Sequence, residues 1–268
     1  ALSFGVAGSG TAAGGAAASG NVVTNRVAAE ISGSTVDAGA ALDLSASSSA
    51  IIRSLAIGVA GSGTAAVQLV AQGNVVANTV TATITGSTVT ADGDIRLSAS
   101  DTAPSLIPDW IVPDTDDDGD TSTPTIKGQL EKALSGSPIE LTANILAVSV
   151  NVSGSGTAAV SASLMGNDIT NRVAVDIDRS TVRAGVDASG AVTAPDADVS
   201  LAALSDAGIV SLTVGVGGSG TVAVDATGFG NVITNTVEAR ILGGSMAEAS
   251  GAISLTAQDQ SSIRSVGL

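Results

Sequence analysis

The chain of 268 residues contains no cysteine, no histidine and no tyrosine. The absence of cysteine excludes disulfide bonds and thiol chemistry. Histidine, cysteine and tyrosine also supply many of the general bases and nucleophiles of enzymes, so their absence argues against catalysis. Paired carboxylates could still cleave a glycoside. However, Asp176 and Asp178 lie beside Arg179 on one face of an expected strand, which indicates a surface charge pair. We therefore expect no enzyme.

Charged residues make up only 13% of the chain, against about 25% in typical globular proteins. Ten basic residues stand against 25 acidic ones, for a formal net charge of −15. This balance argues against nucleic acid as a partner, because binding it needs a basic face. No apolar run approaches the ~18–20 residues of a membrane span. The chain has neither an initiator Met nor a signal peptide, so we expect a processed product or a segment of something longer.

What the chain has in abundance is Ala, Val, Gly, Ser and Thr, arranged in four copies of one unit. The segment GSGT begins at Gly8, Gly61, Gly154 and Gly218. A Gly-Asn pair starts twelve residues later in every copy, and a second Asn follows the first by four residues. GSGT lacks the Lys of a phosphate-binding P-loop. The constant step to Gly-Asn, beside variable gaps elsewhere, indicates the corners of a stacked coil.

Period-2 alternation and enrichment in Thr and Val predict strands throughout the repeats. "TAAVQLVAQ" could form a short helix, but its counterpart "TVAVDATGF" is β-branched and interrupted by Gly, so we expect a strand. The fold class is therefore all-β: a β-solenoid, specifically a right-handed parallel β-helix, with a thin core of small side chains. Whether each copy makes one large coil or two smaller ones stays open.

The repeated Asn residues are predicted to mark turns and to form hydrogen-bonded ladders between neighbouring coils. Gly before Asn would supply a corner with positive φ. A ligand-binding row of Asn is the alternative interpretation. The first Asn of each copy is Asn21, Asn74, Asn167 and Asn231, and the second is Asn25, Asn78, Asn171 and Asn235.

Five segments follow from these repeats. They are repeat 1 (1–53), repeat 2 (54–100), an acidic insert rich in Pro and Asp (101–140), repeat 3 (141–206), and repeat 4 with the start of the next repeat (207–268). Solenoids accept such insertions because a loop can leave the stack without disturbing the ladder.

The insert contains "DTDDDGD", which resembles the first half of a calcium-binding loop: carboxylates at positions 1, 3 and 5 and Gly at position 6. The candidate Ca²⁺ ligands are Asp114, Asp116, Asp118 and Asp120. The twelfth position, where an EF-hand has Glu, is Thr125, so a looser calcium site and a merely solvated acidic loop are the two alternatives. Residues 128–134 form the one expected helical turn. Trp110 either pins the loop to the solenoid or stacks on a carbohydrate.

Units such as "LAIGVAGSGTAAV…GNVVANTVTATITGSTVTADGDIRLSA" resemble the repeats of giant bacterial surface and secreted proteins, the filamentous-haemagglutinin-like and leukotoxin-like adhesins. The resemblance covers nearly the whole chain apart from 101–140 and 184–198. It implies an extracellular β-helical stalk or fibre, located at the cell surface, without catalytic residues. No secretion or anchoring module is recognisable in the chain.

The two ends of the chain suggest a continuing array. The tail "SIRSVGL" resembles the lead-in that "ALSFGVAGSG" lacks. We therefore expect one period of a longer array, covalent or assembled head to tail from copies of the chain; a cut at an arbitrary point is the alternative. The predicted function is a structural or adhesive segment of a filament. The alternatives are a Ca²⁺-dependent module that binds glycan, protein or a cell surface through the insert, and a carbohydrate-active β-helix.

Overall fold

Each repeat folds into one layer of four strands in the computed structural model, which describes residues 1–106 and 142–268. The layers are numbered 1 to 4 in chain order. No helix occurs in these two ranges, and accordingly none of membrane-spanning length. The segment "TAAVQLVAQ" is strand, as predicted, because its residues lie within or just before β6 (Ala65–Thr85). The expected helical turn at 128–134 lies outside the described residues. The described chain is therefore all-β.

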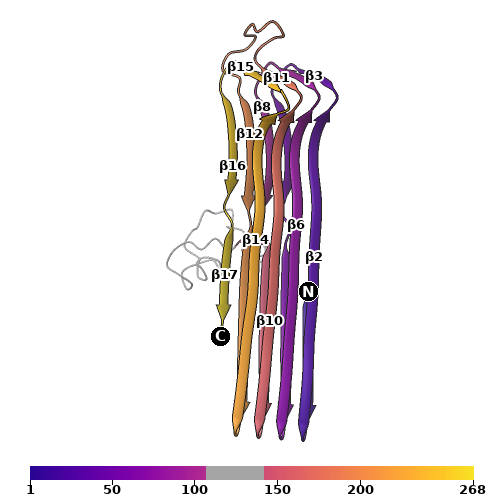
Figure 1. Cartoon of the computed structure of the whole chain (residues 1–268), viewed down its shortest axis with the longest axis vertical. Coiled ribbons are helices and arrows are strands. Elements are labelled where there is room, and N and C mark those ends of the chain that lie inside the picture. Colours follow the sequence, from indigo (N-terminus) through magenta and orange to yellow (C-terminus); the bar gives the residue numbers. More distant parts are fainter. Residues whose placement is uncertain (107–141) are drawn as a thin grey trace, which may run out of the picture.

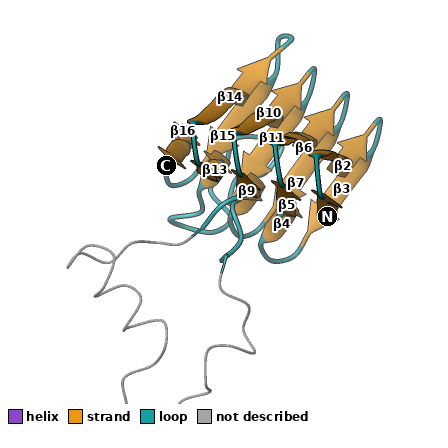
Figure 2. Cartoon of the chain, turned by 90° about the horizontal axis from the view of Figure 1, so that it is seen from below, coloured by secondary structure: helices purple, strands orange, loops and turns teal. Residues whose placement is uncertain are grey.

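Equivalent strands of successive layers pair in parallel and form four sheets, named A to D here (Figures 1 and 2). Sheet A contains β1 (Leu2–Ser9), β5 (Ile52–Ser62), β9 (Ile145–Ser155), β13 (Gly208–Ser219) and β17 (Ser262–Gly267). Sheet B contains β2 (Ala12–Ser32), β6 (Ala65–Thr85), β10 (Ala158–Asp178) and β14 (Val222–Leu242). Sheet C contains β3 (Thr35–Ala38), β7 (Thr88–Ala91), β11 (Thr181–Ala184) and β15 (Met246–Ala249). Sheet D contains β4 (Leu42–Ser48), β8 (Ile95–Thr102), β12 (Val199–Asp206) and β16 (Ile253–Asp259).

The register of the sheets reproduces the alignment of the repeats. In sheet B the four glycines of the Gly-Asn pairs are direct neighbours, in the order Gly20, Gly73, Gly166 and Gly230. Each repeat thus contributes one strand to each of the four sheets. The GSGT segments lie at the turn from sheet A to sheet B, the position that their spacing predicted. β17 adds a fifth strand to sheet A.

The repeats differ in length mainly in the segments between their strands. The fourth copy has one residue more than the others between its first Asn and the Ser that follows sheet B. This extra residue lies in the turn from β14 to β15, where Gly243 and Gly244 both have positive φ, of 68° and 75°. The stretch 185–198 lies between β11 and β12, and the acidic insert lies between β8 and β9. Asp101 and Thr102, which composition had assigned to the insert, form the end of β8.

The layers have two different interiors. Where sheets B, C and D face one another, the core is aliphatic and includes Val80, Ile84, Ile95, Leu97 and their equivalents in other layers. This part is called the wide half. Where sheet A faces the first half of sheet B, the interior holds mostly Gly, Ala, Ser and amide side chains, with few larger apolar groups such as Val70 and Met165. This part, which ends at the GSGT turns, is called the narrow half (Figure 1).

Close spacing of sheets A and B explains the small interior of the narrow half. A Cβ atom added at Gly58 would lie 2.4 Å from the Nε2 atom of Gln68 and 2.6 Å from the Cγ2 atom of Val70. Larger side chains in sheet A must therefore point outwards, and Leu55, Ile57 and Val59 do so. The narrow half has small and polar groups inside and aliphatic groups outside.

Candidate functional site

The first Asn of each copy forms one continuous hydrogen-bonded row through the interior. Each side-chain Nδ2 donates to the Oδ1 of the next layer. The distances are 2.8 Å from Asn21 to Asn74, 2.7 Å from Asn74 to Asn167 and 2.7 Å from Asn167 to Asn231. In the inner layers these amides are almost completely buried, so the row satisfies polar groups that could not reach water.

The expectation that the Gly-Asn pairs form corners was wrong. All four pairs lie inside the 21-residue strands of sheet B, and none of these glycines has positive φ. The chain turns instead after sheet B, at Gly33, Gly86, Arg179 and Gly243, each with φ between 48° and 68°. Pairing with identical neighbours on both sides outweighs the local turn preference of Gly-Asn.

Sheet A completes the first Asn row with serine. Asn74 donates to the Oγ of Ser54 at 3.0 Å, and Asn167 donates to the Oγ of Ser211 at 3.0 Å. In the last layer, Asn231 donates to the Oγ of Ser265 on β17 at 2.6 Å. The row therefore ties the narrow half together across the two sheets.

The second Asn of each copy does not form a side-chain ladder of the same kind. Its inner members surround Asp101, a fully buried carboxylate at the end of β8. Asn78 Nδ2 donates to Asp101 Oδ1 and Oδ2 at 3.1 and 3.3 Å, and Asn171 Nδ2 donates to Oδ2. In the outer layer, Asn235 donates to Asp259 at 3.3 Å. The Asn25 side chain lies half-buried at the same register position in layer 1.

Burial raises the pKa of Asp101, although the hydrogen bond from Asn78 acts in the opposite direction. In sheet D, Asp101 is in register with Ser48 on one side and Ser205 on the other. Asp259 is the register partner of Ser205 in the last layer. Asp101 was not identified as a buried residue from the sequence, because it is the first residue of the stretch assigned to the acidic insert. Its alignment with Ser48 and Ser205 is the signal that could have identified it as an inward residue.

A substitution of Asp101 tests this burial. The folded chain holds the Asp101 proton more tightly than the unfolded chain, so the free energy of unfolding should fall as the pH rises from about 4 towards neutrality. Asp101→Asn keeps the shape and removes this component. Relative to the wild type, the variant should therefore gain stability as the pH rises. Urea unfolding at several pH values measures this difference, and parallel curves for the two proteins would contradict it.

A third row consists of serine and was not recognised as a ladder in the sequence. The Oγ atoms of Ser87, Ser180 and Ser245 each accept a hydrogen bond, at 3.1 Å, from the backbone N–H of the equivalent Ser one layer before. Its signal was the thirteen-residue step from the first Asn to Ser-Thr-Val in the first three copies, which becomes fourteen residues, to Ser245, in the fourth copy. The row fixes the turn from sheet B to sheet C.

Charged side chains gather on the outer face of sheet B in layers 3 and 4. Arg240 contacts both carboxylate oxygens of Asp176, at 2.8 and 3.0 Å, and Glu238 at 2.8 Å. Glu238 also pairs with Arg172 at 2.8 Å. The hydrogen bond with Asp176 raises the pKa of Arg240. Arg179, the partner expected for Asp176 and Asp178, pairs with Asp178 alone, at 2.9 Å.

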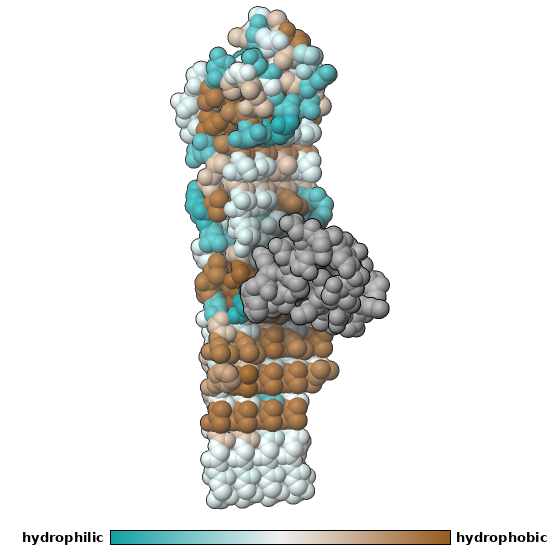
Figure 3. Space-filling view, turned by 180° about the vertical axis from the view of Figure 1, so that it is seen from behind, coloured by the Kyte–Doolittle hydropathy of each residue, from teal (hydrophilic) through white to brown (hydrophobic). Residues whose placement is uncertain are grey.

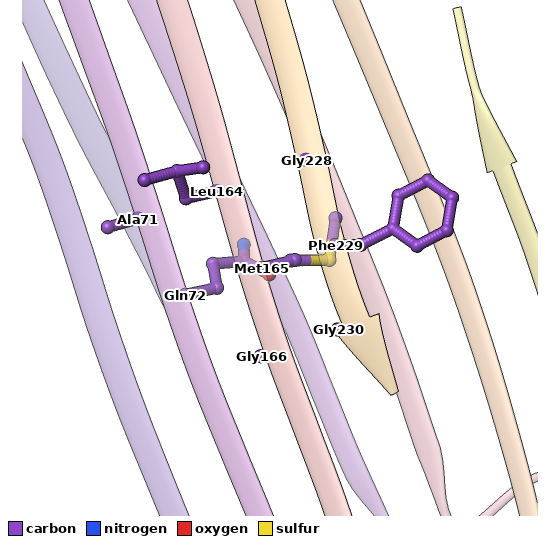
Figure 4. Close-up of a pocket in the computed structure, with 8 residues that line it drawn as sticks. All are labelled: Ala71, Gln72, Leu164, Met165, Gly166, Gly228, Phe229 and Gly230. Carbon is purple, nitrogen blue, oxygen red and sulfur yellow. The ribbon is translucent and has the colours of Figure 1, made fainter. Parts of the chain in front are cut away.

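One shallow hollow lies at sheet B of the narrow half (Figure 4). It is lined by Ala71, Gln72, Leu164, Met165, Gly166, Gly228, Phe229 and Gly230. Leu164 projects to the opposite side of the sheet from Met165 and Phe229. The hollow is mostly apolar and offers no cluster of nucleophiles or bases.

The candidate Ca²⁺ ligands Asp114, Asp116, Asp118 and Asp120, and the candidate contact Trp110, lie outside the described residues. Within residues 1–106 and 142–268, no group of three or more acidic side chains is placed to hold a metal ion. Of the candidate site residues, the described part therefore contains the two sets of Asn, and the calcium site stays a prediction.

No family model, no curated protein and no solved structure matches this chain.

Proposed function

We propose that this chain is a structural or adhesive segment of an extracellular filament or giant surface adhesin. It is a parallel β-solenoid, right-handed like nearly all parallel crossovers, and it extends when further layers of its own pattern stack on its ends. These layers belong to neighbouring repeats of the same polypeptide or to a second copy. The observation that carries the proposal is the match between the charges of the first and last layers.

This match follows from the register of sheet B. Arg26 in layer 1 has the register position of Arg172, and Glu30 has that of Asp176. Arg172 and Asp176 are the residues that pair with Glu238 and Arg240 of layer 4. A copy placed on layer 4 would therefore offer Arg26 to Glu238 and Glu30 to Arg240. Layer 4 would have the same two ion pairs on both sides.

The Asn row has a direction that suits the same assembly. Every amide donates towards layer 4, so layer 1 presents the Oδ1 of Asn21 outwards. The strands are parallel throughout, and the two open edges of such a sheet are complementary to each other. Stacking would also cover exposed apolar residues of the last layer, such as Phe229 and Leu255.

Two features oppose gapless stacking. Glu248 of layer 4 would lie beside Asp37 of the next copy, since both share the register position of Arg183 and Thr90. In addition, Val266 of β17 has the register position of Leu2. The tail therefore overlaps the head rather than ending where the head begins, which corrects the expectation from the sequence. A copy that stacks on layer 4 must therefore displace either β17 or the first residues of its own β1 from this position.

Two lysine substitutions in layer 1 test the proposal. Glu30→Lys should weaken end-to-end assembly because it places Lys beside Arg240. Asp37→Lys is the matched variant: it makes the same charge change on an equally exposed strand, but should strengthen assembly because it meets Glu248. Each substitution should change the midpoint concentration of assembly by about 2- to 5-fold at low salt, Glu30→Lys upwards and Asp37→Lys downwards. Sedimentation velocity over a range of concentrations measures it.

Equal effects of the two lysines, or a chain that stays monomeric at every concentration, would contradict stacking. High salt should reduce the difference between the two variants, because exposed ion pairs are screened. The extracellular part of the proposal rests on the resemblance of the repeats. Immunogold labelling of thin sections of source cells tests it, and label confined to the cell interior would overturn it.

A further inference from the structure

We propose that the outer face of sheet A in the narrow half binds the same face of a second copy, so that two filaments pair side by side. This inference rests on the proposed end-to-end stacking, because the face of one chain is small. It concerns a different surface, however, and a different experimental readout. The occupant is a copy of this chain, docked face to face.

The face consists of three rows of outward aliphatic side chains, each running across the layers (Figure 3). The rows are Leu2, Leu55, Val148, Leu212 and Val266; Phe4, Ile57, Val150 and Val214; and Val6, Val59, Val152 and Val216. Several of these side chains are strongly exposed, including Phe4 at 60%, Val6 at 77% and Val216 at 53%. Among the described residues, no other element packs over these three rows.

Charge is almost absent from this face, although the chain carries a net charge of −15. The strands of sheet A contain only two charged residues, Arg53 and Arg264. Both lie in one outward row next to that of Leu55, at the border of the face. Two copies can therefore approach through this surface without bringing like charges into its centre.

The shape of the face suits pairing with itself. Identical or similar residues follow each other in register, so the rows form straight ridges with grooves between them, as in the facing sheets of a β-sandwich. The face also has a hollow of about 420 Å³, lined in part by Leu2, Leu55, Leu146 and Val148. The exposed ring of Phe4 lies in the next row. A ridge and a hollow on one surface are what a two-fold interface requires.

The area explains why lateral pairing depends on stacking. Four strands about 4.8 Å apart and three rows about 6.6 Å apart give a face of roughly 400 Å². Stable interfaces bury roughly 800 Å² per partner. One chain falls short of this value, whereas two stacked chains reach it. Pairing should therefore be weak for single chains and strong for filaments.

Other surfaces and occupants fit less well. The outer face of sheet B is uneven at the same height, because layer 1 has Gly14 and Ala16 where layer 2 has Val67 and Leu69. A lipid surface would place the unpaired backbone groups at both edges of sheet A in contact with hydrocarbon, which is costly. A filament of this chain pairs those groups and keeps the flat face.

Two matched double variants test the inference by negative-stain imaging of filaments. Val59→Lys with Val216→Lys charges the face on sheet A, at side chains that are 38% and 53% exposed. Val67→Lys with Val224→Lys makes the same change on sheet B, in the same two layers, at side chains that are 51% and 48% exposed. We expect paired filaments from the wild type and the sheet B variant, and a filament of half the width from the sheet A variant.

Each of the other outcomes contradicts either lateral pairing or end-to-end stacking. Wild-type filaments of single width, or equal effects of the two variants, overturn lateral pairing and leave stacking intact. Absence of filaments from the wild type overturns stacking and, with it, this inference. A parallel sedimentation assay uses uncharged phosphatidylcholine vesicles. Vesicle binding that is lost only in the sheet A variant, without paired filaments, would assign the face to lipid.

Discussion

Asn74→Ala should lower the free energy of unfolding by roughly 3 kcal/mol, because it breaks the Asn row where the row is fully buried. The Asn74 amide accepts from Asn21 and donates to Asn167 and Ser54. Alanine leaves the Oδ1 of Asn167 without its donor and opens a cavity between sheets A and B. Urea unfolding at neutral pH measures the loss.

Asn21→Ala is the control at the same position of layer 1. This side chain is only half-buried and donates a single bond within the row, so water can replace its partner. We expect a loss of about 1 kcal/mol or less. Similar losses for Asn21 and Asn74 would mean that the row contributes little and that the aliphatic core alone fixes the register.

The repeats predicted the stacking of strands because identical residues recur at one spacing, and only parallel, in-register pairing aligns all of them. The same information located the turn at GSGT but placed a second corner wrongly, at Gly-Asn. Gly-Asn is a turn signal when read alone, yet β6 continues through the pair, and its alternation of buried and more exposed residues is not interrupted there. In β6 that alternation places Gly73 outwards and Asn74 inwards. Long-range pairing decided the conformation.

The orientation of sheet A could not be predicted from hydrophobic alternation. In "LAIGVAG" the large residues Leu55, Ile57 and Val59 alternate with Ala and Gly, a pattern that normally places the large residues inside. The structure has the opposite orientation. The cause is the distance to sheet B, which leaves no room for a Cβ atom at Gly58. No local feature of the sequence predicts the distance between sheets A and B.

These two halves of each layer account for different parts of the proposed function. The wide half has an aliphatic core and carries the charged residues that match the first layer to the last. The narrow half has a polar ladder inside and an aliphatic face outside, so its interior holds the register while its exterior is free to bind. Stability and lateral contact therefore depend on different residues and can be changed separately.

Leu97→Ala should be the most destabilising single change in the wide half. Leu97 is 1% exposed and lies in the centre of the aliphatic core. Truncation of such a leucine removes buried methyl groups and leaves a cavity between layers, at a cost of about 3 kcal/mol. Urea unfolding of dilute, monomeric protein measures this loss, and a value below about 1 kcal/mol would show that the layers can collapse around the cavity.

Leu255→Ala is the matched change, and it links stability to stacking. Leu44, Leu97, Leu201 and Leu255 form one register row in sheet D. Leu255, in the last layer, is 44% exposed, so in the monomer its truncation should cost about 1 kcal/mol. A further layer would bury Leu255 as layer 3 buries Leu97. The cost of Leu255→Ala should therefore rise towards that of Leu97→Ala as protein concentration increases and filaments form. A cost that does not change with concentration would mean that the last layer stays uncovered.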